Sequence, residues 1–182
     1  RMLNAREFGL PHQRLRLFII ASQFKEIATS LHRDVAAFPS SEPEFDQVEY
    51  CNGFYWTAGL QSICLSEGFT PTLKVGSSLS IPSPPAVHFG STVRKLTSDE
   101  CLRLQGFDPL EFDATKAKDV HRMAGNAVAV PVGNFVFDSV NSECIGIEDL
   151  TMQRGFPFGR FPNHGLLLDG EYWSVEHKTG TL

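Results

Sequence analysis

The sequence predicts an α/β fold, and three observations carry this prediction. An apolar run at residues 15–21 indicates a strand, and segments with helical periodicity begin at Thr97 and span residues 127–140. At 182 residues the chain is long enough for one hydrophobic core, or for one modest domain with a small lobe.

Two arginines stand at the start of the strand. Side chains at i and i+2 of a strand share a face, so Arg14 and Arg16 point the same way, while Leu15 and Leu17 point the other way. Residues 17–20 are apolar at every position, which predicts a strand covered on both sides. The arginine pair is either a solvated strand end or a pair of fixed cations aimed at an anion or a carbonyl group.

A helix and an irregular lobe are expected next. Apolar residues at spacings of three and four predict a short helix over residues 23–33. Residues 36–85 have poor periodicity and many serines, glycines, prolines and scattered aromatics, which predicts a small irregular lobe. This lobe closes with the sequence GSSLSIPSPP at residues 76–85, which indicates a loop.

The sequence predicts two helices after this lobe. Thr97 and Glu100 form a capping box at the start of the first, and Gly106 is placed to end it. The second, at 127–140, must hold Pro131 in its first turn or be kinked by it. Its apolar stripe consists of Val128, Val132, Phe135, Val136 and Val140.

The tail predicts a hairpin. Asp169 and Gly170 separate two apolar segments, and this dipeptide is typical of a tight β-turn. Beyond Asn141 the chain otherwise loses its periodicity.

Composition and charge argue against several classes of protein. No apolar run approaches a membrane span of about 20 residues, and the sequence starts without a signal-peptide pattern. The four cysteines are widely spaced without metal-site patterns, so we expect reduced thiols, no metal and a cytoplasmic protein. A net charge of -5 argues mildly against an independent nucleic-acid binder, although the first 25 residues are locally basic.

Three stretches carry a family resemblance. They are NAREFGLPHQRLRLFIIA at 4–21, RKLTSDECLRLQGFD at 94–108 and AGNAVAVPVGNFV at 124–136. In this order they resemble the eighth, ninth and tenth motifs of a cytosine-C5 DNA methyltransferase, in the C-terminal half of that enzyme. The resemblance implies the C-terminal portion of a Rossmann-like domain dependent on S-adenosylmethionine, with a target-recognition lobe.

The resemblance also implies a division of the chain. Residues 1–33 would end the catalytic domain, 34–93 would form the target-recognition lobe, and 94–141 would pack the lobe and catalytic domain together. Residues 142–182 would be a C-terminal extension.

In this family the target cytosine is flipped out of the duplex. The match implies that Arg16 holds the cytosine O2, and that Arg14 braces the pocket or a phosphate. A guanidinium suits both tasks, because it is permanently charged and offers several donors in one plane. The family usually has Gln at the position of His12, which leaves a polar loop contact open.

Cofactor and DNA contacts follow from the same resemblance. Gly125, Asn126 and Ala127 would touch S-adenosylmethionine, although simple helix capping also explains a Gly-Asn turn. Double-stranded DNA would meet the recognition lobe at Thr72, Leu73, Ser77 and Ser78. Thr72 and Leu73 are similar to the Thr-Leu pair near the end of the family's recognition domain. Arg94 and Arg103 are either phosphate or interdomain contacts or solvated surface.

Three parts of the family's site are missing from this sequence. The glycine-rich cofactor loop, the Pro-Cys dipeptide of the nucleophile and the Glu-Asn-Val segment do not occur. We therefore expect a chain that is inactive alone and completed by the N-terminal half or large subunit of a bacterial restriction-modification methyltransferase. It is either a natural split subunit or a fragment, and the start at Arg1 slightly favours a fragment. A non-catalytic DNA-recognition or regulatory module is the alternative.

A half-domain would leave apolar surface without cover. We expect this for two groups of side chains that a serine-rich lobe cannot bury. They are Leu17, Phe18, Ile19 and Ile20 on the strand, and Val128, Val132, Phe135 and Val136 on the last helix.

Overall fold

The computed structural model describes residues 1–35, 51–55, 65–74, 85–109, 116–143, 145–155 and 163–176. The chain forms two compact units. The first unit consists of Arg1–Leu3, Arg16–Phe38 and Asn134–Leu182, and the second of Asn4–Leu15 and Pro39–Gly133. Helices and sheets are mixed, which is compatible with the expected α/β class. No helix in the described ranges has the length and apolar character needed to cross a membrane.

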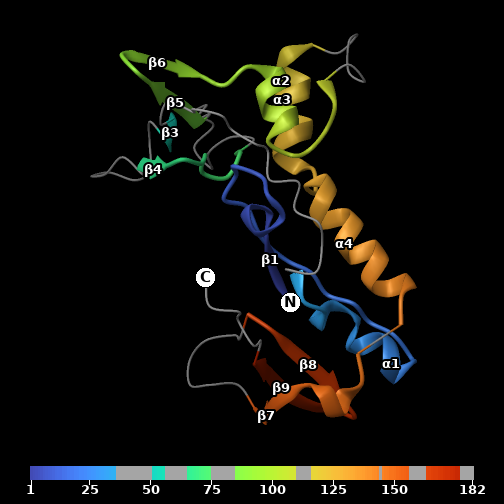
Figure 1. Ribbon diagram of the computed structural model, residues 1–182. Coiled ribbons are helices and arrows are strands. Elements are labelled where there is room, and N and C mark those ends of the chain that lie inside the picture. Colours follow the sequence, from blue (N-terminus) through green and yellow to red (C-terminus); the bar gives the residue numbers. More distant parts are fainter. Residues whose placement is uncertain are drawn as a thin grey trace. The chain divides into compact units, whose positions relative to one another are not determined.

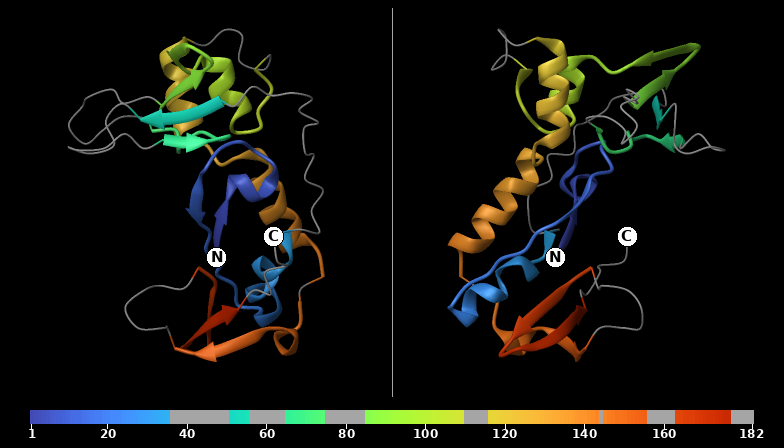
Figure 2. Two further views of the ribbon diagram at one scale, coloured as in Figure 1. Left: turned by 60° about the vertical axis from the view of Figure 1, so that its left-hand side comes forward. Right: turned by 180° about the vertical axis from the view of Figure 1, so that it is seen from behind.

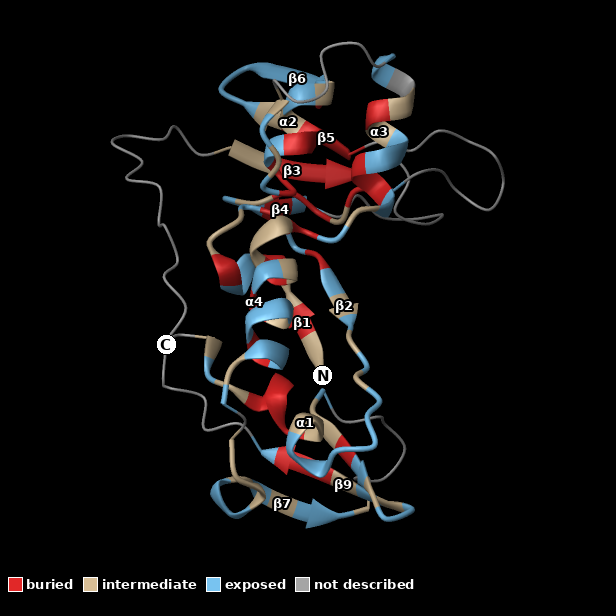
Figure 3. Cartoon of the chain, turned by 90° about the vertical axis from the view of Figure 1, so that its right-hand side faces the viewer, coloured by how far each residue is buried: buried red, intermediate tan, exposed pale blue. Residues whose placement is uncertain are grey.

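A four-stranded antiparallel sheet forms part of the second unit (Figure 1). Its order is β4-β3-β5-β6, with β3 and β5 in the centre. Figure 3 shows these two central strands largely buried, whereas β6 is exposed along its length. The strands are β3 Cys51–Tyr55, β4 Leu65–Glu67, β5 Pro85–Phe89 and β6 Thr92–Lys95.

Strands β3, β4 and β5 lie in the part of the chain that was predicted to form a small irregular lobe. The strands are only three to five residues long, so none of them gives a clear alternating pattern. Ser77 and Ser78, with most of the predicted loop at 76–85, lie outside the described residues. The part of this loop that is described, Pro85, begins β5.

Helix α2, Ser98–Arg103, begins with the predicted capping box. The Glu100 amide donates to the Thr97 hydroxyl over 3.2 Å, and the Thr97 amide donates to Glu100 Oε2 over 2.8 Å. Gly106 follows the helix with φ +81°, a left-handed conformation that side chains disfavour. The prediction that Gly106 ends this helix is confirmed.

Two further helices follow, and the first was not predicted. Helix α3 spans Ala117–Asn126, and α4 spans Val130–Asn141 with Pro131 in its first turn, as expected. Gly125 and Asn126 were predicted as the turn that enters the last helix, whereas they are the final residues of α3. The last helix consequently begins three residues later than predicted.

The hydrophobic core of the second unit joins the sheet to these helices. Figure 2 shows α2 and α3 side by side near the sheet. The buried side chains of this core are Leu73, Val87, Leu96, Cys101, Leu102, Leu104, Val120 and Ala124. The core therefore combines residues from the four-stranded sheet with residues from α2.

A three-stranded antiparallel sheet in the first unit has the order β7-β9-β8. Its strands are β7 Thr151–Arg154, β8 Gly165–Leu168 and β9 Glu171–Glu176. Asp169 and Gly170 join β8 to β9 with φ angles of 51° and 81°, so the predicted hairpin is confirmed. Two short helices also belong to this unit, α1 Lys25–Ala28 and the 3-10 helix η2 Ser30–His32, in place of the single helix predicted at 23–33.

The strand predicted at 15–21 is shortened to β2, Leu15–Leu17, which pairs with β1, Met2–Asn4. The exposed fractions of Leu17 and Ile19 are 60% and 79%, so this chain does not itself cover both faces of the strand, and the exposure expected for these two residues is confirmed. Both antiparallel sheets described above also differ from the parallel sheet of a Rossmann-like domain.

The expected exposure on the last helix is confirmed only in part. Val128 is 48% exposed, but Val132 and Phe135 are 3% and 1% exposed. These two side chains are covered by the chain's own residues, and the Arg1 guanidinium carbon lies 5.7 Å from the centre of the Phe135 ring.

Candidate functional site

The guanidinium of Arg14 joins two segments that are far apart in the sequence. Arg14 is 3% exposed, and its Nη2 donates to the carbonyl oxygens of Gly125 and Ala127 over 3.0 and 2.6 Å. The last carbonyls of a helix have no partner within the helix and carry partial negative charge, so a cation at the end of α3 is favourable. The predicted pocket residue and the predicted cofactor residues are thus brought together within the second unit.

Gln105 also forms a hydrogen bond with the end of α3. This fully buried side chain donates from Nε2 to the Ala124 carbonyl over 2.6 Å, and its backbone carbonyl accepts from the Val130 amide over 2.7 Å. Sequence reasoning did not single out Gln105. The sequence does place Gln105 between the apolar residues of α2 and Gly106, and a polar side chain in such a position needs a hydrogen-bond partner if it is buried.

His12 links three segments of the second unit. Its Nε2 accepts from the Leu73 amide over 3.1 Å, so Nδ1 carries the proton and donates to the Leu104 carbonyl, also over 3.1 Å. His12 is fully buried. The polar contact that was left open for this position is therefore a connection between the eighth-motif loop, the end of the recognition lobe and the end of α2.

Thr72 and Leu73 pack on this loop. The Thr72 hydroxyl donates to the Gln13 carbonyl over 2.7 Å, and the Tyr55 hydroxyl donates to the Thr72 carbonyl. Leu73 is 4% exposed and belongs to the core. The side chain of Leu73 packs within this chain, and the DNA contacts expected for Thr72 and Leu73 stay predictions.

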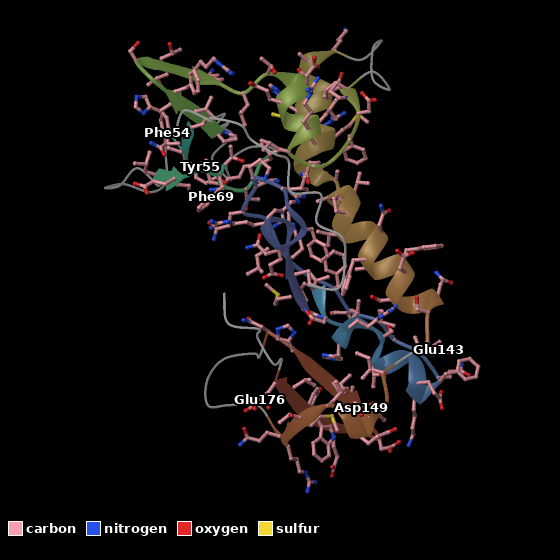
Figure 4. All side chains as sticks on the ribbon, in the orientation of Figure 1. Phe54, Tyr55, Phe69, Glu143, Asp149 and Glu176 are labelled. Carbon is pink, nitrogen blue, oxygen red and sulfur yellow. The ribbon has the colours of Figure 1, made fainter. Side chains whose placement is uncertain are left out.

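Two cations lie over aromatic rings in the same unit. The Arg6 guanidinium carbon is 4.4 Å from the centre of the Phe69 ring, and Lys74 Nζ is 4.1 Å from that of Tyr55. Figure 4 labels both aromatic residues. Stacking on a ring restricts an exposed cation, so Arg6 and Lys74 present partly fixed positive charge in this unit. Arg16 belongs to the first unit, where its side chain is partly buried.

A pocket of about 340 Å³ lies at the end of α3. It is lined by Leu102, Phe107, Arg122, Met123, Ala124, Asn126 and Ala127. Most of the lining side chains are apolar, and Arg122 and Asn126 add a cation and an amide to the lining. These side chains fit parts of S-adenosylmethionine, which has an aromatic base and a carboxylate.

The two cysteines that the structure describes are free thiols without nucleophilic character. Burial raises the pKa of Cys101 to about 12, and the nearby Glu100 carboxylate adds to this effect. Burial also raises the pKa of Cys51 above its ordinary value, although Arg94 opposes the shift. Both side chains are therefore protonated near neutral pH, where a thiolate would be needed for attack.

Arg94 is engaged within the chain. Its guanidinium donates to both carboxylate oxygens of Glu100, over 2.8 and 2.7 Å. This ion pair explains the position of the Arg94 side chain without a phosphate contact. Arg103, at the end of α2, is exposed.

Comparison with known proteins shows which protein family the chain is similar to. Residues 74–142 match the model of the family described as C-5 cytosine-specific DNA methylase. This range contains the ninth- and tenth-motif stretches but not the arginines of the eighth. The resemblance is confirmed: this part of the chain is similar to part of a cytosine-C5 DNA methyltransferase.

A curated relative extends the match. The Type II methyltransferase M2.BsuMI of Bacillus subtilis (strain 168) is 32% identical over 160 residues, which cover 82% of this chain and 41% of the relative. The chain thus spans about two fifths of the relative's length. No solved structure matches the chain significantly.

Proposed function

We propose that this chain is the C-terminal part of a DNA (cytosine-5)-methyltransferase, and that it supplies target recognition and a pocket arginine in the complete enzyme. The observation that supports this most directly is the pair of hydrogen bonds from Arg14 to Gly125 and Ala127. They join the eighth- and tenth-motif segments across more than 100 residues of sequence, as a shared site for substrate and cofactor requires.

Arg16 is the residue we assign to the flipped cytosine. A nucleophile that attacks C6 pushes electron density towards the ring carbonyl, and a guanidinium at O2 stabilises this charge. The side chain is only partly buried and follows the buried Arg14 by two residues. In the proposed enzyme, Arg16 therefore acts on the reacting ring, while Arg6, Lys74 and Thr72 are available for the DNA backbone.

S-adenosylmethionine would supply the methyl group. Asn126 and Ala127, at the rim of the pocket beside α3, are the residues of this chain that we expect to hold it, and Arg122 offers a charge for its carboxylate. Neither Cys51 nor Cys101 suits nucleophilic attack, because burial raises both pKa values. The nucleophile and the glycine-rich loop are therefore assigned to the N-terminal part of the enzyme, as a separate subunit or the same chain.

Methyl transfer tests this function. The complete protein that contains these residues, or this chain mixed with its N-terminal part, is incubated with double-stranded DNA and S-adenosylmethionine carrying a tritiated methyl group. We expect tritium in cytosine C5, with none transferred by the 182-residue chain alone. Transfer by the purified, mass-verified chain alone would contradict the division of labour, and no transfer by the complete protein on any DNA would contradict the function.

A non-catalytic DNA-recognition or regulatory module remains the second candidate. The unsuitable thiols of Cys51 and Cys101 favour it, because this chain then needs no nucleophile. The same experiment separates the two functions: a module of this kind binds DNA in a gel-shift assay, but adding the N-terminal part produces no methylated cytosine.

A further inference from the structure

The end of α3 has an unusual set of hydrogen-bond partners. Three of its carbonyl groups, those of Ala124, Gly125 and Ala127, accept from side chains that come from elsewhere in the second unit. Gln105 serves the first carbonyl, and Arg14 serves the other two. Helix ends usually leave such carbonyls to water or to local capping, so this end is held from two directions.

The link between α3 and α4 is held at its other side as well. Ala127 leaves the helix in an extended conformation, with φ -65° and ψ 156°, and its amide donates to the Met123 carbonyl over 2.8 Å. The Val130 amide then donates to the backbone carbonyl of Gln105. Gln105 thus contacts the chain on both sides of Gly125–Ala127, with its side chain before this segment and its backbone after it.

Burial distinguishes these two side chains from surface contacts. Arg14 and Gln105 are 3% and 0% exposed, and the Nη2 bonds of Arg14 end on backbone carbonyls. A buried guanidinium in this position is remote from solvent, where a DNA phosphate would approach. Arg14 therefore differs in role from Arg16, although the two residues share the RxR pattern.

We propose that Arg14 and Gln105 are positioning residues for the cofactor, which fix the segment Gly125–Ala127 so that it can hold S-adenosylmethionine. The inference rests on the proposed function and deepens it, because it assigns one arginine of the pair to cofactor affinity and the other to the cytosine. Loss of either positioning residue lowers affinity for S-adenosylmethionine and leaves affinity for DNA unchanged.

Two conservative substitutions test whether the hydrogen bonds to the end of α3, rather than the charge or the shape of the side chain, are what matters. Arg14→Lys keeps the cation but replaces a rigid planar group by one flexible ammonium, which holds two carbonyls less firmly. Gln105→Glu keeps the shape, but a carboxylate cannot donate to the Ala124 carbonyl. Arg154→Lys is the control, because Arg154 lies on β7 in the first unit, where it pairs with Glu171.

The test measures two affinities in the complete methyltransferase. Isothermal titration gives the Kd for S-adenosylmethionine, and fluorescence anisotropy with a short duplex gives the Kd for DNA. We expect each conservative variant to raise the cofactor Kd about tenfold, which corresponds to ~1.4 kcal/mol, with the DNA Kd within about twofold. Arg154→Lys should leave both the cofactor Kd and the DNA Kd unchanged.

Hydrogen exchange on the same variants, without any ligand, supplies an independent measurement. We expect faster exchange of the amides between Ala124 and Val130, and unchanged exchange in the β-sheet of the same unit. Unchanged exchange at this segment, or lost DNA affinity with unchanged cofactor affinity, would overturn the proposal. Failure of both variants to fold would also overturn it, since the residues would then serve stability alone. A wild-type protein that binds the cofactor but methylates no DNA would contradict the proposed function and leave this inference standing.

Discussion

The carboxylate of Glu100 accepts two hydrogen bonds from the guanidinium of Arg94, which lies on the edge strand β6. The same carboxylate accepts from the Thr97 amide and so completes the capping box of α2. These bonds, with that from Arg94 contributing most, lower the pKa of Glu100 to about 2 from an ordinary value of 4.5. One side chain thus ties the recognition-lobe sheet to the first turn of the ninth-motif helix.

We expect Glu100→Gln to destabilise the chain by about 0.5–1 kcal/mol at pH 7, because glutamine retains the capping bond but loses the ion pair. The estimate is small because the side chains of Arg94 and Glu100 are 48% and 34% exposed. The lowered pKa means that the pair stabilises the fold above about pH 4.5 and loses its effect as the pH falls towards 2.

Urea unfolding of the wild type and Glu100→Gln over this pH range checks the prediction. The difference in unfolding free energy should shrink as the pH falls, since both carboxyl and amide are then neutral. Thr97→Ala is the control, because it removes the cap without the ion pair and should cost about 1 kcal/mol at both ends of the range. A difference between wild type and Glu100→Gln that stays constant with pH would contradict the role of the ion pair.

Gly53 and Gly133 form a matched pair for a second prediction. A Cβ at Gly53 would lie 2.6 Å from both the Phe69 carbonyl oxygen and Thr70 Cα, so Gly53→Ala should destabilise by about 1–3 kcal/mol. A Cβ at Gly133 meets only Val128 Cγ1 at 3.8 Å, and alanine in the helix should stabilise by about 0.5–1 kcal/mol. Thermal melting of both variants measures the two changes. Equal effects of the same sign would show that the close approach of β3 to residues 69–71 does not limit this position.

Local features of the fold could be predicted from the sequence. The capping box of α2 and the hairpin at Asp169–Gly170 depend on side chains and backbone groups within four residues of one another. The four-stranded sheet could not be predicted, because the strand pairs β3–β5 and β3–β4 join short segments that are separated in the sequence. Helix α3 was missed because its sequence AKDVHRMAGN has few apolar residues to reveal a stripe.

The candidate site also has features that could be predicted from the sequence and features that could not. The arginines of the eighth motif and the Gly-Asn pair were identified by resemblance, but nothing local to Arg14 indicates that it bonds to Gly125 and Ala127. Gln105 was missed because its partner, the Ala124 carbonyl, is a backbone group and leaves no trace in residue types. Leu73 was assigned to DNA by its place in a motif, and that motif does not reveal that its side chain is buried in the core.

Arg16→Ala in the complete enzyme should lower turnover more than DNA affinity. A contact that strengthens as the cytosine carbonyl gains charge acts on the transition state, and its loss is expected to slow turnover by roughly 2–4 kcal/mol in activation free energy. Single-turnover methyl transfer and DNA titration separate the two quantities, and Arg103→Ala, an exposed cation at the end of α2, is the control. Unchanged turnover with weaker, salt-sensitive DNA binding would instead identify Arg16 as a phosphate contact.

The exposed segment at the end of β2 leads to the last prediction. Leu17 and Ile19 are 60% and 79% exposed, and burying one such side chain is worth roughly 1.5–3 kcal/mol. We therefore expect the isolated 182-residue chain to self-associate at micromolar concentration, through this segment. Replacing both residues with threonine keeps the preference for extended structure and should shift sedimentation towards the monomer, with little change in melting temperature because neither side chain is buried.

Leu167→Thr provides the control for this experiment, because Leu167 on β8 is similarly exposed at 58% but lies in the C-terminal sheet. Its replacement should leave association unchanged, whereas addition of the N-terminal part of the enzyme should suppress self-association of the wild type by covering Leu17 and Ile19. Sedimentation velocity measures all four samples. A wild-type chain that sediments as a compact monomer and melts cooperatively would contradict the prediction, since the apolar segment would then need no cover and residues 1–140 would not be half of a domain.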